Sequence, residues 1–183
     1  MDLYLSTNHL SHPHPFKPFN SLKTMKEITI ETKMQLCQFE ELTKEQQQLV
    51  RMACDATQNS YSPYSKFRVG SALRMADGTI TIGANQENAS YPVGLCGERV
   101  ALFTAQAQHP DQPVASIAIA ARNDNGFLEK PVSPCGMCRQ AIMEVEDRYK
   151  QPIEILLYGT EGTLVIKSIR DLLPLYFVGD SMK

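Results

Sequence analysis

Two short cysteine motifs, far apart in the chain, constrain the fold more than any other feature of this sequence. Cys96 is followed two residues later by Glu98, and Cys135 and Cys138 form a Cys-x-x-Cys pair that is preceded by proline. Zinc favours thiolate and imidazole ligands, and a catalytic zinc typically has three protein ligands and one position open to water. If the three cysteines bind one zinc ion, the chain must fold so that the two motifs meet. The sequence therefore predicts a fold organised around an open zinc site.

Two other interpretations of these cysteines are weaker. A redox-active Cys-x-x-Cys beside an unrelated buried Cys96 leaves the Cys-x-Glu spacing and Pro134 unexplained. A structural zinc site prefers a fourth protein ligand, and Cys37 and Cys54 have no cysteine or histidine at a zinc-ligand spacing. The motifs are similar to those of the zinc deaminases, in which three thiolates bind zinc and a glutamate that is not a ligand carries protons. By that resemblance, Glu98 is the general acid and base.

The composition is that of one globular domain. The chain has 183 residues, 43% of them hydrophobic and 21% charged, which are ordinary values for a soluble protein. Its net charge is −2 and it has no long basic run, so we expect neither nucleic acid nor an anionic membrane as a partner. Cysteines committed to a metal favour a reducing compartment, and we expect a cytoplasmic protein.

Residues 1–40 differ from the rest and are expected to be an N-terminal extension to a catalytic domain over 41–183. Prolines at 13, 15 and 18 interrupt the first part, because proline cannot lie inside a helix or a central strand. We therefore expect the extension to be largely disordered. Weak alternation over 27–40 indicates a short extended arm.

From residue 43 onward the pattern alternates between strands and helices. Thr43 and Gln46 form a capping box, which predicts a helix over 44–59. The other expected elements are a hairpin of strands over 67–75 and 79–83, a helix over 100–107, a strand over 114–121, a helix that begins at Cys135, strands over 153–158 and 163–167, and a short helix over 169–173. This order predicts an α/β sheet with helices on both faces.

The expected helices also bear on the cysteines. Both motifs fall at helix starts, where the partial positive charge of unpaired N–H groups favours thiolates. Zinc with three thiolates has a formal charge of −1, so a nearby cation would keep its bound water acidic. Arg99 and Arg139 are the candidates, and a surface ion pair is the alternative for each.

Four polar residues, Asn85, Gln86, Glu87 and Asn88, follow the predicted strand over 79–83. They could form a solvated loop, or they could line the same pocket as the zinc motif that begins a few residues later. The residues alone leave both possibilities open.

Four blocks in order resemble the small, homo-oligomeric cytidine deaminases. They are Ser62-Pro-Tyr-Ser-Lys-Phe-Arg-Val-Gly70, Asn85-Gln-Glu-Asn-Ala-Ser-Tyr91, Cys96-Gly-Glu-Arg99 and Ser133-Pro-Cys-Gly-Met-Cys-Arg-Gln140. The similarity extends from about Leu42 to Asp180. It implies a three-layer α/β/α sandwich with a five-stranded mixed sheet, a zinc cofactor, and a homotetramer whose subunits share active sites.

The resemblance also assigns site residues. Asn85 and Glu87 would bind the ribose hydroxyls, Phe67 would line the pyrimidine pocket, and Phe177 would cover the base in a neighbouring subunit's site. Gly97 would contact the substrate and Arg99 would support the metal centre. The sequence departs from the family at Gln86, where a small aliphatic residue is usual, and at Gly97, where alanine is usual.

The function implied is zinc-dependent hydrolysis of cytidine and deoxycytidine to uridine and deoxyuridine with release of ammonia, as in pyrimidine salvage. Two alternatives use the same motifs. One is a related zinc deaminase that acts on another small aminonucleoside. The other is a non-catalytic, zinc-stabilised binding module, which would need a basic, aromatic-rich face that the net charge does not support.

Overall fold

The computed structural model describes residues 26–183, so expectations for residues 1–25 fall outside it. Residues Glu31–Lys183 form one compact unit, which is the part described below. Within the described residues, none of the helices has the length and apolar character that crossing a membrane would require.

A mixed sheet of seven strands forms the centre of this unit. The strands run in the order β1-β7-β6-β4-β2-β3, and β5 pairs with β4. Strands β4 and β6 are parallel, and the other pairs are antiparallel. The bounds are β1 Gln35–Cys37, β2 Arg68–Met75, β3 Ile80–Ala84, β4 Val114–Asn123, β5 Gly126–Phe127, β6 Glu154–Gly159 and β7 Gly162–Ile166. The five longer strands are those expected from the sequence, and β1 and β5 are short additions at the margins.

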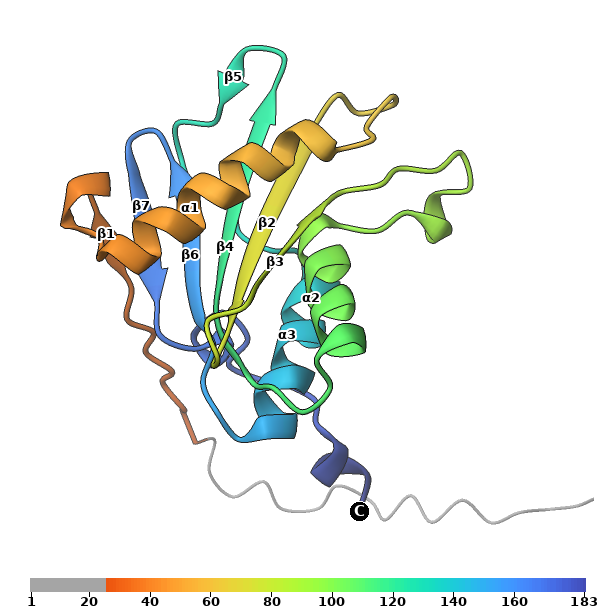
Figure 1. Ribbon diagram of the computed structural model, residues 1–183. Coiled ribbons are helices and arrows are strands. Elements are labelled where there is room, and N and C mark those ends of the chain that lie inside the picture. The colour runs from red at the N-terminus through yellow and green to blue at the C-terminus, as the bar shows by residue number, and fades with distance from the viewer. Residues whose placement is uncertain (1–25) are drawn as a thin grey trace, which may run out of the picture. The chain divides into compact units, whose positions relative to one another are not determined.

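Three helices complete a three-layer sandwich. Helix α1 (Lys44–Ala56) lies on one face of the sheet, and α2 (Gly97–Gln108) and α3 (Gly136–Tyr149) lie on the other (Figure 1). The α/β fold class and the helices on both faces are as the sequence predicts.

Successive side chains of a strand point to opposite faces of the sheet, so the two faces pack against different helices. On β4, Ile117 and Ile119 are buried against α2 and α3, whereas Ala118 is buried against α1. The small side chains on the face that packs against α1 let this helix approach the sheet closely. A Cβ added at Gly70 would lie 2.1 Å from the carbonyl oxygen of Ala53 on α1, so glycine is required at this crossing.

The predicted capping box starts α1. The Gln46 N–H donates to the Thr43 hydroxyl at 3.2 Å, and the Thr43 N–H donates to the Gln46 side chain at 3.0 Å. The predicted helix ran to residue 59. The α-helix ends at Ala56, and residues Thr57–Asn59 continue as a 3₁₀ turn.

Both cysteine motifs lie at helix starts. Cys96 and Cys135 are the residues immediately before the first turns of α2 and α3. Helix α2 therefore begins at Gly97, earlier than the expected 100–107. Because α2 and α3 pack on the same face of the sheet, their first turns bring the two motifs together.

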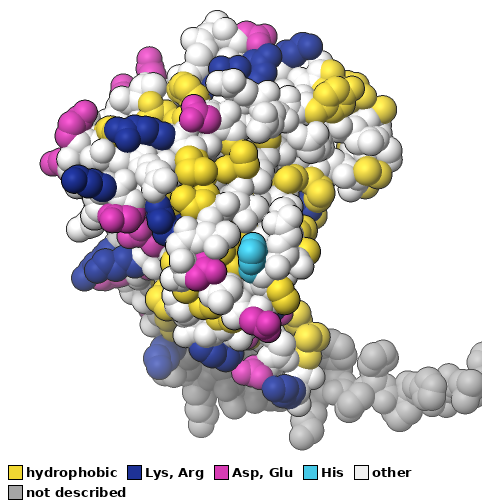
Figure 2. Space-filling view, viewed as in Figure 1, with side chains coloured by type: hydrophobic (Ala, Val, Ile, Leu, Met, Phe, Trp, Pro, Cys, Tyr) yellow, Lys and Arg dark blue, Asp and Glu magenta, His cyan; other side chains and the backbone are white. Residues whose placement is uncertain are grey.

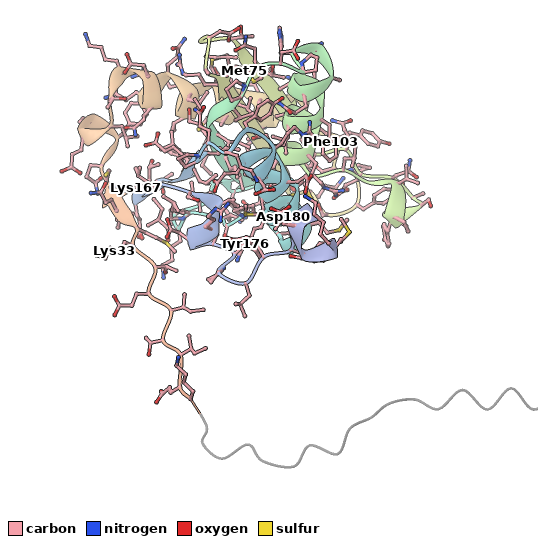
Figure 3. All side chains as sticks on the ribbon, turned by 90° about the horizontal axis from the view of Figure 1, so that it is seen from below. Lys33, Met75, Phe103, Lys167, Tyr176 and Asp180 are labelled. Carbon is pink, nitrogen blue, oxygen red and sulfur yellow. The ribbon has the colours of Figure 1, made fainter. Side chains whose placement is uncertain are left out.

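A buried carboxylate ties the C-terminal segment to α3. Glu146 accepts hydrogen bonds from the Ile153 and Ile169 N–H groups at 3.0 and 3.2 Å, and from the Ser168 hydroxyl at 2.7 Å. The guanidinium of Arg170 donates to it at 3.1 Å. The short helix expected at 169–173 is a single 3₁₀ turn over Ile169–Asp171, and Tyr176 and Asp180 follow it in the chain (Figure 3).

Candidate active site

The three cysteines of the two motifs converge. The Cys96 and Cys135 sulfurs are 4.0 Å apart, the Cys135 and Cys138 sulfurs are 3.5 Å apart, and all three lie within 4.8 Å of one another. A tetrahedral zinc with Zn–S bonds near 2.3 Å holds its sulfur ligands about 3.8 Å apart. The spacing and the donor set both fit zinc.

The thiols share their protons unevenly. A hydrogen bond from the Cys138 thiol lowers the pKa of Cys96 to about 5, although burial acts in the opposite direction. The adjacent Arg99 guanidinium contributes to the same lowering. The pKa of Cys138 is raised, because its proton is engaged by Cys96 and the side chain is buried. Cys96 is therefore ready to act as a thiolate, and a metal that binds all three sulfurs displaces the remaining protons.

Glu98 lies beside the sulfurs in the first turn of α2. The residue is only 5% exposed, and its Oε2 has no hydrogen-bond partner among the described residues. Burial, and then the negative charge of Cys96, raises the pKa of the Glu98 carboxyl. An unpaired polar atom in the interior costs free energy, so this carboxyl is poorly explained as a fold element and well suited to proton transfer.

A cavity of about 630 Å³ opens over these groups. It brings together six of the residues that the sequence assigned to the site, namely Phe67, Asn85, Glu87, Cys96, Glu98 and Cys135. Its remaining walls are Tyr64, Ser65, Val69, Gln86, Asn88, Tyr91, Gly94, Leu95, Ile119, Val132 and Ser133. Cys138, Gly97, Arg99 and Phe177 are not among the residues that line it.

Asn85 is held at the end of β3 by contacts on both sides of its amide. Its Oδ1 accepts from the Ser60 hydroxyl at 2.6 Å and from the Val69 N–H at 2.8 Å, and its Nδ2 donates to the Phe67 carbonyl at 3.0 Å. The side chain therefore joins the end of β3 to the start of β2.

Glu87 holds the neighbouring segment that contains Tyr64 and Ser65, which also lines the cavity. One carboxylate oxygen accepts from the Tyr64 and Ser65 N–H groups at 2.9 and 3.2 Å, and the other accepts from the Ser65 hydroxyl. The bond from Ser65 is the main reason that the pKa of Glu87 is lowered. Ser60 and Ser65 were not singled out from the sequence, because their spacing from Asn85 and Glu87 follows no local rule.

Two loops form the mouth of the cavity. One contains residues 61–64, and the other, called the mouth loop below, contains residues 86–95. The Gln86 and Leu95 backbones exchange hydrogen bonds of 2.9 and 3.0 Å, and the Glu87 N–H donates to the Tyr61 carbonyl at 2.8 Å. Tyr64 and Tyr91 meet edge to face with ring centroids 6.2 Å apart. Apolar side chains gather on this end of the molecule (Figure 2), where Tyr61, Tyr64, Tyr91, Val93 and Leu95 are exposed. Backbone pairing of this kind leaves no periodic sequence pattern, which is why it was not predicted.

Gly97 is packed against β2 and β3. A Cβ at this position would lie 2.9 Å from the Val69 carbonyl oxygen and 3.3 Å from the Ala84 Cα. The absence of a side chain therefore lets the start of α2 lie close to the sheet. A substrate contact from Gly97 stays a prediction and would come from its backbone.

The two arginines next to the motifs have different surroundings. Arg99 points its Nη2 toward the Cys96 sulfur, at 3.8 Å. Arg139 instead donates to the Pro134 and Leu172 carbonyls at 2.8 and 2.7 Å. Arg99 is thus the cation beside the thiols, and Arg139 fixes the segment that leads into α3.

Phe177 is half exposed, and its carbonyl oxygen accepts a bond of 2.7 Å from Gln140 on α3. It does not reach the cavity of its own chain. This position is compatible with the expectation that it acts in a neighbouring subunit, which stays a prediction.

An α/β sandwich with three converging thiols and a buried carboxyl beside them defines a zinc-binding enzyme of the deaminase type. Residues 43–150 match the family described as the cytidine and deoxycytidylate deaminase zinc-binding region. The cytidine deaminase of Halalkalibacterium halodurans is 37% identical over 138 residues, which are 75% of this chain and 98% of that protein. The cytidine deaminase of Sporosarcina psychrophila is 38% identical over 128 residues, covering 70% and 88%.

Solved structures agree with the sequence relatives. The cytidine deaminase of Burkholderia pseudomallei superposes with a TM-score of 0.62 at 38% identity, covering 74% of this chain and all of that one. That of Mycobacterium tuberculosis has a TM-score of 0.56 at 27% identity, covering 71% and 94%. The chain belongs to the cytidine and deoxycytidylate deaminase family.

Proposed function

We propose that this protein is a cytidine deaminase that converts cytidine and deoxycytidine, with water, into uridine and deoxyuridine and ammonia. The observation that carries the proposal is the buried Glu98 carboxyl, which faces the same cavity as the thiols of Cys96 and Cys135. Relatives described as cytidine deaminases match most of the chain. Nothing in the described site favours the alternative of a non-catalytic binding module.

Cys96, Cys135 and Cys138 would hold the zinc ion. When bound, zinc supplies a Lewis acid that lowers the pKa of a water molecule toward 7. Arg99 offsets part of the negative charge that three thiolates bring to the site. We expect the protein to work in the cytoplasm, because thiol ligands must stay reduced.

Glu98 would carry the protons of the reaction. It accepts a proton from the attacking water and passes it to the ring nitrogen beside C4. It then accepts the proton of the hydroxyl added at C4 and passes it to the amino group, which leaves as ammonia when the C–N bond breaks. Protonation of the ring makes C4 electrophilic, and loss of ammonia leaves the carbonyl of the uracil ring. Burial raises the pKa of Glu98 and favours its neutral form, which makes the carboxylate a stronger base toward the attacking water.

The part of the cavity lined by Asn85 and Glu87 would bind the sugar. Asn85 and Glu87 line it with an amide and a carboxylate, and both types of group bind hydroxyls. Phe67 provides an apolar wall beside them, which suits a pyrimidine ring.

The assembly proposed is a homotetramer in which neighbouring chains complete each other's sites. Exposed apolar side chains outside the cavity support an interface. They include Phe103 on α2 (Figure 3), Met137 at the start of α3, and Leu175 and Phe177 in the C-terminal segment.

A substrate panel tests the activity. The protein with zinc bound should release one ammonia per uridine formed from cytidine and should also act on deoxycytidine. Free cytosine, which lacks the sugar that Asn85 and Glu87 would bind, should be a much poorer substrate. A preference for another aminonucleoside over cytidine would favour the related-deaminase alternative, and no turnover of any compound would contradict the proposal.

A further inference from the structure

Ser65 lines the cavity, although its side chain is not part of the chemistry described above. It lies in the turn between Tyr64 and Phe67, and both of these residues line the cavity with Ser65 and Glu87. The next residue, Lys66, has a φ of 58°, a conformation that non-glycine residues seldom adopt. Contacts that hold this turn are therefore expected on either side of Lys66.

The Ser65 hydroxyl makes two such contacts at once. It donates its proton to a carboxylate oxygen of Glu87, and it accepts a 3.0 Å hydrogen bond from the Phe67 N–H. A hydroxyl has one proton to donate, so its direction is fixed. The same oxygen atom thus links the carboxylate assigned to the sugar with the backbone of the residue assigned to the base.

The acceptor capacity of Glu87 gives this arrangement a consequence for binding. An ionised carboxylate offers about four lone-pair sites. Three are used by the Tyr64 N–H, the Ser65 N–H and the Ser65 hydroxyl. About one acceptor site is left, and its direction is set by the three occupied ones.

We propose that Ser65 is a positioning residue for nucleoside binding, which orients Glu87 toward the sugar hydroxyl and holds Phe67 at a fixed distance from it. This inference rests on the proposed function. It adds that the sugar and base contacts are coupled through one serine hydroxyl. Loss of the hydroxyl would free Glu87 to rotate and leave the Phe67 N–H without this partner.

Steady-state kinetics with cytidine test the inference on five variants with their zinc content verified. Ser65→Ala should raise KM about tenfold, since a hydrogen bond to a charged acceptor contributes at least that much, with little change in kcat. Ser65→Thr keeps the hydroxyl and should restore most of the affinity. Ser90→Ala is the matched control, because Ser90 is an exposed serine of the mouth loop whose side chain makes no capping bond.

The combination with Glu87→Gln separates positioning from general damage. If Ser65 acts through Glu87, Ser65→Ala should add less than about twofold to KM in the Glu87→Gln background. A full tenfold effect in that background, or no effect of Ser65→Ala on KM, would overturn the inference. Loss of zinc or a clearly lower melting temperature in Ser65→Ala would also overturn it, because the hydroxyl would then be needed for the fold itself.

The same experiment keeps the two proposals apart. The wild-type protein must deaminate cytidine for the proposed function to hold, whatever the serine variants do. If cytidine is turned over and Ser65→Ala matches the wild-type KM, the function stands and the positioning role fails. If cytidine is not turned over, the proposed function fails and the role of Ser65 toward this nucleoside fails with it.

Discussion

The guanidinium of Arg99 is the charged group that most directly supports the thiol cluster. Its Nη2 lies 3.8 Å from the Cys96 sulfur. Groups that contact metal ligands without binding the metal typically change metal affinity or activity by 10- to 100-fold when they are removed. The residue does not line the cavity, so its contact with Cys96 is its link to the site.

We therefore predict that Arg99→Gln lowers zinc affinity by about tenfold, because the thiolates lose the neighbouring positive charge. Competition with a chelator measures this directly. Lys167→Gln is the control, as it removes the same charge from an exposed side chain just after β7. Equal zinc affinities of the two variants would show that Arg99 does not support the metal site.

The three cysteines and Glu98 could be singled out from the sequence as the candidate metal ligands and proton carrier, because that chemistry demands particular residue types at short spacings. The partners of Asn85 and Glu87 could not. Ser60 and Ser65 reach them only after β2 and β3 pair and bring together segments more than twenty residues apart. The position of Phe177 relative to a neighbouring site depends on a second chain, which a single sequence does not describe.

At the scale of the elements, Glu146 joins α3 to the C-terminal segment. It is 3% exposed and accepts four hydrogen bonds, from two backbone N–H groups, Ser168 and Arg170. A buried carboxylate is stable only when it is paired and hydrogen-bonded. This residue therefore fixes the path of the segment that leads to Phe177.

Glu146→Gln should lower the free energy of unfolding by about 3 kcal/mol, because an amide NH₂ cannot accept bonds that the carboxylate accepts now. Urea denaturation with intrinsic tyrosine fluorescence would measure it. Glu144→Gln is the matched control on the same helix, since Glu144 is exposed, and it should change stability by less than about 0.5 kcal/mol. Similar losses in both variants would mean that the bonds to Glu146 do not hold the segment.

Element types were predictable where side-chain patterns are strong. The capping box at Thr43 predicted the helix, and short runs rich in apolar residues predicted the strands β2, β4 and β6. The two shortest strands were missed as strands, because β1 and β5 have only three and two residues and depend on pairing with β7 and β4. Helix α2 was expected over 100–107 and begins at Gly97, because glycine is a poor indicator of a helix.

At the scale of the whole molecule, the proposed homotetramer would decide whether each site is complete. Phe177 does not line the cavity of its own chain. If it closes a neighbour's site, Phe177→Ala chains lack the lid in that neighbour and Glu98→Gln chains lack the proton carrier in their own site. Each variant alone should be weak.

Mixed assembly should restore activity. When the two variants are refolded together in equal amounts, about a quarter of sites combine an intact Glu98 with a neighbour's intact Phe177, by simple counting over a shared interface. The specific activity should then exceed the mean of the two parents. Activity that only averages the parents, with mixed oligomers verified by native mass spectrometry, would show that the lid is not shared.

The most direct test of the central claim measures ammonia release from cytidine and bound zinc together, in the wild-type protein and in Glu98→Gln. The wild-type should bind about one zinc per chain through its three cysteines and should release ammonia in step with uridine. Glu98→Gln should keep its zinc and melting temperature, and its kcat should fall at least ~10²-fold, because the proton carrier is lost while the metal site is intact. A zinc-loaded wild-type that releases no ammonia, or a Glu98→Gln protein that keeps its rate or loses its zinc, would contradict a zinc-dependent deaminase with Glu98 as its acid and base.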